Sequence, residues 1–74
     1  MPARLRDLVR VLVEFGIRVD PPRGGGSHWK AIAANGSAFV LPANNGLRTE
    51  LADVYIRELC RTMGIDYAEL KKRL

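Results

Sequence analysis

Apolar residues near the start of the chain recur three or four positions apart, which is the spacing of one helix face. The members of this stripe are Leu5, Leu8, Val9, Leu12 and Phe15. Arg6, Arg10 and Glu14 fall on the opposite side. We therefore predict an amphipathic helix over residues 3–15, ended by Gly16, because glycine adopts the left-handed conformation of a helix C-cap without steric cost.

Three short segments show strand character, with apolar and β-branched residues between turn residues. They are residues 17–20, 28–34 and 37–41. Pro21 and Pro22 end the first segment and Pro42 closes the third, because proline has no N–H to donate to a sheet.

The second and third predicted strands are separated by Asn35-Gly36. This dipeptide is typical of a two-residue hairpin with a type I′ turn, which requires positive φ at both central positions. The two strands are therefore expected to pair antiparallel.

A loop over residues 43–48 leads to a second predicted helix over residues 50–63. Its apolar stripe consists of Ala52, Tyr55, Ile56, Leu59, Cys60 and Met63. Gly64 is expected to cap its C-terminus. Asp66 then resembles the N-cap of a short final helix, which ends in the cations of residues 71–73.

The order of these elements is helix, strand, strand, strand, helix, with a short C-terminal helix. It predicts an α+β fold, a small two-layer α-β-β-β-α sandwich with a three-stranded antiparallel sheet. Both main helices should cover one face of the sheet and leave the other open. We expect residues 1–74 to form a single domain, because 74 residues suffice for one compact unit and not for two.

Composition narrows the classes of function. The net charge is +4, and nine of the twelve cations are arginine, which favours a polyanionic partner, nucleic acid first. The single cysteine, Cys60, excludes an intrachain disulfide and a cysteine-pair metal site. Charges throughout the first residues argue against a signal peptide or a membrane span, so we expect a cytoplasmic protein with no membrane partner.

Several segments, taken in order, resemble the HicA toxins, which are small RNA-cleaving proteins with a fold like that of double-stranded-RNA-binding domains. The matching segments are Glu14-Phe15-Gly16, Gly26-Ser27-His28, Val40-Leu41-Pro42 and residues 56–65. The resemblance covers nearly the whole chain. Trp29 and Asn44 stand where many members carry further histidines.

The resemblance implies a toxin of a type II toxin–antitoxin system, an endoribonuclease (mRNA interferase) that cleaves mRNA. It assigns catalysis to His28, and it implies a HicB-type antitoxin protein as the partner that covers the site. No cofactor and no metal are expected.

The chemistry of imidazole suits His28 to the role of a general base. An imidazole with a pKa near ~6.5 is suited to take the proton of a ribose 2′-OH, and that oxygen then attacks the adjacent phosphorus. Lys30, two residues further along the strand, shares a face with His28 and is predicted to hold phosphate. Ser27 and the backbone N–H groups of the glycine run that ends at Gly26 are further RNA-binding candidates.

Other residues carry less specific predictions. Arg6 and Arg10, with Arg57 and Arg61, are candidates for RNA phosphate contacts, and solvated helix faces with local acidic partners are the alternative for all four. Trp29 is expected to pack into the core. Two further functions stay open: an RNA-binding module without catalysis, and a relative that binds a protein through the open sheet face.

Overall fold

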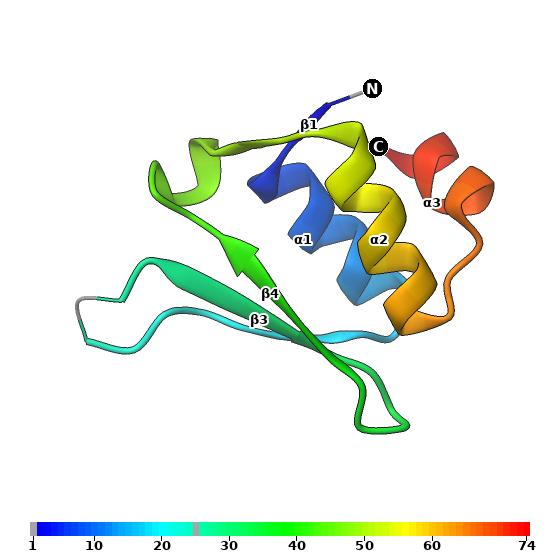
Figure 1. Cartoon of the computed structure of the whole chain (residues 1–74), viewed down its shortest axis with the longest axis horizontal. Helices are drawn as coiled ribbons and strands as arrows, with labels where there is room; N and C mark the ends of the chain where they lie inside the picture. The colour runs from blue at the N-terminus through cyan, green and yellow to red at the C-terminus, as the bar shows by residue number, and fades with distance from the viewer. Residues whose placement is uncertain (1, 25) are drawn as a thin grey trace.

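The computed structural model describes residues 2–24 and 26–74. In chain order the elements are β1 (Ala3–Arg4), α1 (Leu5–Glu14), β2 (Arg18–Asp20), β3 (His28–Ile32), β4 (Ala38–Pro42), the 3-10 helix η1 (Gly46–Arg48), β5 (Glu50–Leu51), α2 (Asp53–Met63) and α3 (Tyr67–Arg73). The main sheet has the order β2-β3-β4 and is antiparallel throughout. Figure 1 shows α1 and α2 over one face of this sheet. The predicted α+β sandwich is confirmed.

The first helix begins two residues later than predicted. Ala3 and Arg4 instead form β1, which pairs antiparallel with β5 in a second, two-stranded sheet. The same pairing shortens the second helix, which was predicted from residue 50 and begins at Asp53. Two-residue strands carry no periodic pattern, and their pairing uses backbone groups that nearly every residue has.

Alternation along β3 and β4 assigns one face of the main sheet to the core. Ala31 and Leu41 are fully buried, and Trp29 and Phe39 pack against the same core. The cross-strand register places Trp29 beside Leu41 and Ala31 beside Phe39. The side of the sheet turned away from the helices, here called the open face, carries the side chains of alternate positions, among them His28, Lys30, Val40 and Pro42.

The hairpin between β3 and β4 forms, but not with the predicted type I′ turn. The N–H of Gly36 donates to the carbonyl of Ala33 at 2.9 Å, and the N–H of Ala33 donates to the carbonyl of Ser37 at 2.8 Å. Gly36 has φ +91°, whereas no described residue other than glycine has positive φ. This is a three-residue loop with a glycine bulge. Asn35 accepts from the N–H of Ser37 instead of adopting positive φ.

At the outer edge of β4 the backbone is protected. The hydroxyl of Tyr55, from α2, donates to the carbonyl of Val40. Burial raises the pKa of Tyr55, so the phenol keeps the proton that it donates. Pro42 lies within β4 rather than after it, and it pairs with His28. Because this is an edge strand, a missing N–H is tolerated there.

The C-terminal elements follow the predicted signals. Gly64 ends α2 with φ +73°. The carboxylate of Asp66 accepts from the N–H of Ala68 at 2.9 Å and caps α3. Cys60 is buried, as its place on the apolar stripe predicted. Among the helices of residues 2–24 and 26–74, none has the length and apolar character needed to cross a membrane.

Candidate functional site

His28 is the first residue of β3 and is exposed on the open face. Its position follows from the alternation of the strand, because Trp29 and Ala31 are turned into the core. The hydroxyl oxygen of Ser27 lies 3.5 Å from Nδ1 of the imidazole. Within the described parts of the chain, Nε2 has no hydrogen-bond partner and remains open to a ligand.

A surface hollow of about 330 Å³ lies beside the imidazole. Its lining comes from three strands and from the loop that joins β2 to β3. The charged or titratable lining residues are Asp20, Arg23, His28 and Lys30, and the rest are Pro21, Pro22, Trp29 and Val40. One imidazole, one ammonium, one guanidinium and one carboxylate therefore surround a space of the size of a small ligand site.

The loop before His28 makes a tight turn. The N–H of Gly26 donates to the carbonyl of Arg23 at 3.1 Å, and Gly24 has φ +61°. A Cβ at Gly26 would lie 3.2 Å from that carbonyl oxygen. Glycine is therefore favoured at position 24 by its positive φ and at position 26 by the close approach of this carbonyl. Gly25, which was also considered as a phosphate donor, lies outside the described residues.

This turn changes the role predicted for Gly26. Its N–H is already bonded to Arg23, so it is not a free donor for phosphate. Of the groups predicted to bind a ligand near His28, the Ser27 hydroxyl and the Lys30 ammonium remain open, both on exposed residues.

Lys30 lies two residues beyond His28 on the same face, as predicted. Its cross-strand partner in β2 is Asp20. The Asp20 carboxylate accepts from Nε of Arg18 at 3.0 Å, an ion pair on the same strand. Arg18 thus partly neutralises the carboxylate of this partner, and Lys30 has no carboxylate within 4.0 Å among the described residues, so its ammonium is available for an anion.

The backbone before His28 is held firmly to the end of β4. The N–H of Ala43 donates to the carbonyl of Ser27 at 2.8 Å and extends the β3–β4 ladder by one pair. Trp29 is half-buried and packs against the core, as predicted. The imidazole is therefore presented from a fixed strand rather than from a slack linker.

Arg6 and Arg10 do not join this group. Both are exposed on α1, on the side opposite its buried residues, and α1 covers the other face of the sheet (Figure 1). Arg10 donates to Glu14 at 3.3 Å and to the carbonyl of Arg73 at 3.4 Å. For Arg10 the alternative of a solvated helix face with a local acidic partner describes the structure.

Arg23 and Asp20 belong to the hollow but were not predicted as site residues. Their places in the sequence could have indicated them, because Arg23 directly precedes the glycine run and Asp20 ends the predicted strand before it. No group of three or more His, Cys, Asp or Glu side chains that could hold a metal ion occurs among the residues that the structure describes.

Comparison with protein-family models gave no match, and comparison with curated proteins gave none either.

Proposed function

We propose that this protein is an endoribonuclease toxin of the HicA type that cleaves mRNA in the cytoplasm without a metal, with His28 as the catalytic residue. The observation that carries the proposal is the hollow on the open face, where an exposed imidazole shares a surface with the side chains of Lys30 and Arg23. The α+β sandwich agrees with the fold that the sequence resemblance implies.

The reaction uses a nucleophile that RNA itself carries. Nε2 of His28 takes the proton of a ribose 2′-OH as the 2′-oxygen forms a bond to the adjacent phosphorus. The bond from phosphorus to the 5′-oxygen breaks, and that oxygen takes a proton from water. The products are a 2′,3′-cyclic phosphate and a 5′-OH end. General base catalysis of this kind supplies about 10²–10⁴-fold.

Neighbouring groups have supporting roles in this scheme. In the neutral tautomer that leaves Nε2 free to accept a proton, Nδ1–H faces the Ser27 hydroxyl oxygen. Lys30 and Arg23 stabilise the charge that develops on the phosphate oxygens. Both positions line the same hollow as the imidazole, so they are placed to contact the phosphate next to a ribose 2′-OH at His28.

A HicB-type antitoxin is the proposed protein partner, with the open face as its docking surface. Val40 is 48% exposed there, and Pro42 pairs with His28 on the neighbouring strand. An antitoxin that buried this apolar surface would also cover the imidazole and block access of RNA.

The decisive experiment compares RNA cleavage by the wild-type protein, by His28→Ala and by Arg61→Gln, all in EDTA. Arg61 is exposed on α2 and paired with Glu58, so its variant controls for a general change of surface. We expect cleavage by the wild type and by Arg61→Gln, with 2′,3′-cyclic phosphate ends. Loss of at least about 10²-fold is expected for His28→Ala. Equal rates for the wild type and His28→Ala would remove the catalytic role.

RNA binding without cleavage is the second candidate. It is favoured by the presence of only one histidine in the chain, because no second imidazole can act as the general acid. In that case wild-type protein binds RNA in a strongly salt-dependent manner and releases no cleaved product. Absence of any RNA affinity at low salt would instead favour a purely protein-binding relative.

A further inference from the structure

The cations of the described chain divide into two groups. Those on the outer surfaces of the helices are mostly ion-paired: Arg10 with Glu14, Arg57 with Asp53, Arg61 with Glu58 and Lys72 with Glu69. By contrast, six cations have no carboxylate within 4.0 Å among residues 2–24 and 26–74: Arg4, Arg6, Arg23, Lys30, Arg48 and Lys71. Arg6 lies on α1 and Lys71 on α3, whereas the other four lie outside the α-helices, on the strands and loops that border the surface hollows.

Two of these free arginines share a second surface hollow. It has a volume of about 490 Å³ and is lined by Arg4, Asn45, Arg48 and Glu50. Arg48 comes from η1, and Arg4 and Glu50 are cross-strand partners in β1 and β5. The hollow is larger than the one at His28 and falls within the range of small-molecule sites.

The hollow is built on a rigid backbone. The hydroxyl oxygen of Thr49, which is 6% exposed, accepts from the N–H of Asn45 at 2.9 Å and donates to the carbonyl of Gly46 at 2.8 Å. The carbonyl of Thr49 accepts from the N–H of Leu5 at 2.7 Å. One buried threonine thus joins the loop that carries Asn45 and Arg48 to the start of α1, next to Arg4.

This hollow lies close in space to the His28 site. Ala43 is hydrogen-bonded to Ser27, and Asn45 follows Ala43 by two residues. A bonded cross-strand pair separates Cα atoms by ~5.5 Å, and each further residue adds at most 3.8 Å, so Ser27 and Asn45 are within about 13 Å. A few nucleotides of one strand span that distance.

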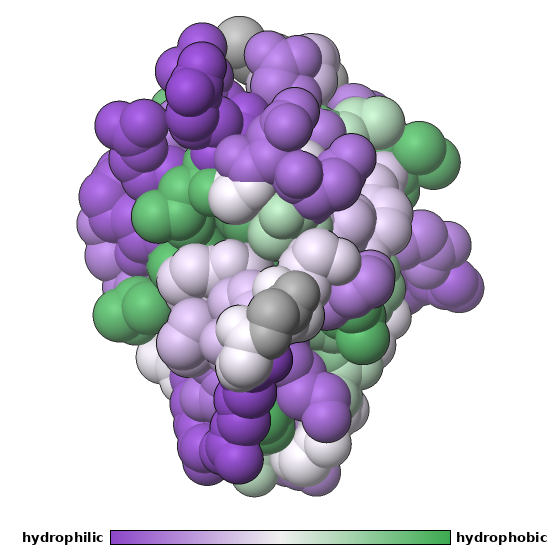
Figure 2. Space-filling model, turned by 90° about the vertical axis from the view of Figure 1, so that its left-hand side faces the viewer, coloured by the Kyte–Doolittle hydropathy of each residue, from purple (hydrophilic) through white to green (hydrophobic). Residues whose placement is uncertain are grey.

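The end of the molecule that carries η1 and the β2–β3 loop lies at the left of Figure 1. Figure 2 views that end, where strongly hydrophilic residues gather at the top and bottom and hydrophobic residues form smaller patches between them.

We infer that the Arg4–Arg48 hollow is a second RNA subsite, which binds a ribonucleotide of the same strand that reaches His28. The two guanidinium groups bind its phosphate, because arginine matches phosphate oxygens with two parallel donors. Glu50 accepts a hydrogen bond from the 2′-OH, the group that distinguishes RNA from DNA. The assignment of the ligand as RNA rests on the proposed function.

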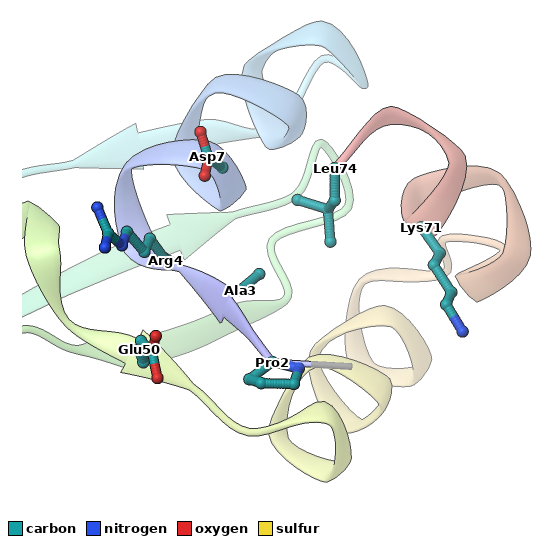
Figure 3. Close-up of a pocket in the computed structure, with 7 residues that line it drawn as sticks. All are labelled: Pro2, Ala3, Arg4, Asp7, Glu50, Lys71 and Leu74. Carbon is teal, nitrogen blue, oxygen red and sulfur yellow. The ribbon is translucent and has the colours of Figure 1, made fainter.

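The neighbouring hollow does not offer the same chemistry. Figure 3 shows this neighbouring hollow, a third one of about 380 Å³, between β1, β5 and the C-terminal residues. Its lining contains two cations, Arg4 and Lys71, and two carboxylates, Asp7 and Glu50, so the charges balance. In Figure 3 the ammonium of Lys71 points away from the other charged groups. An anion therefore gains more in the hollow that Arg4 shares with Arg48.

The test measures binding of a short single-stranded RNA to His28→Ala protein, which leaves the RNA intact, over a series of salt concentrations. Arg4→Gln and Arg48→Gln are each introduced into that background, with Arg61→Gln as the matched loss of one charge. Each of the first two should lower the affinity and reduce the slope of log affinity against log salt, and the reduction should not exceed about 0.7, the value for the one phosphate contact that both arginines share. Arg61→Gln should leave the slope unchanged.

A third variant, Glu50→Gln, tests the 2′-OH contact by comparing RNA with DNA of the same sequence. The preference for RNA should fall. Equal slopes for Arg48→Gln and Arg61→Gln, or no RNA affinity at low salt, would overturn the subsite. RNA binding that depends on Arg4 and Arg48 without any wild-type cleavage would keep the subsite and reject the nuclease. Cleavage that needs His28 but does not depend on Arg4 or Arg48 would keep the nuclease and reject the subsite.

Discussion

The N–H of Leu5, the first residue of α1, donates to the carbonyl of Thr49 at 2.7 Å. This bond joins two segments that are 44 positions apart in the chain, and it lies beside the β1–β5 pair of residues 3–4 and 50–51. The N-terminal segment is therefore bonded to the segment that follows Arg48, and its residue Arg4 lines the same hollow as Arg48.

Replacing Thr49 with valine should destabilise the protein by about 1–3 kcal/mol, because the part-buried N–H of Asn45 loses its acceptor and the carbonyl of Gly46 keeps only the backbone N–H of Thr49 as a donor. Thr49→Ser keeps the hydroxyl and should cost only about 1 kcal/mol for the lost methyl group. Urea unfolding followed by circular dichroism measures both. A valine variant as stable as the serine variant would contradict a structural role for the hydroxyl.

Lys30→Gln should lower kcat/KM for RNA cleavage by about tenfold or more, because a charge-assisted contact to phosphate is worth about 1.5–3 kcal/mol. Folding should be unaffected, since Lys30 is exposed on the open face. Lys72→Gln is the matched control, because Lys72 is exposed on α3 and paired with Glu69. Steady-state cleavage of one RNA substrate by both variants makes the comparison, and similar losses in the two would count against a role for Lys30.

Cys60 should react slowly with a thiol reagent in the native protein and rapidly after unfolding. Burial, with a smaller contribution from the charge of Asp66, raises the pKa of the thiol, so less of the reactive thiolate is present at a given pH. The folded state then keeps a proton that the unfolded state loses, so stability should fall as pH rises through the ordinary thiol pKa of about 8.5. Labelling at pH 8 with and without urea measures the first effect, and equal rates would contradict it.

The sequence by itself determined the helices, the strands of the main sheet and the faces that they bury. The stripe of α1 and the alternation of β3 suffice, because a residue's side in a regular element depends only on the period of that element. The same reasoning placed His28 and Lys30 together and Trp29 in the core. The Asn35-Gly36 signal located the hairpin but not its turn type, which depends on the register that the flanking strands adopt.

Tertiary structure alone decided which distant residues share a surface. Arg23 and Asp20 join His28 only when β2 pairs with β3, and Arg4 meets Arg48 only when β1 pairs with β5. Arg6 and Arg10, chosen from the charge pattern, lie on the other side of the sheet from His28. The physical reason is that local periodicity reports the direction of a side chain within its own element, whereas neighbours from other elements are chosen by backbone pairing and core packing.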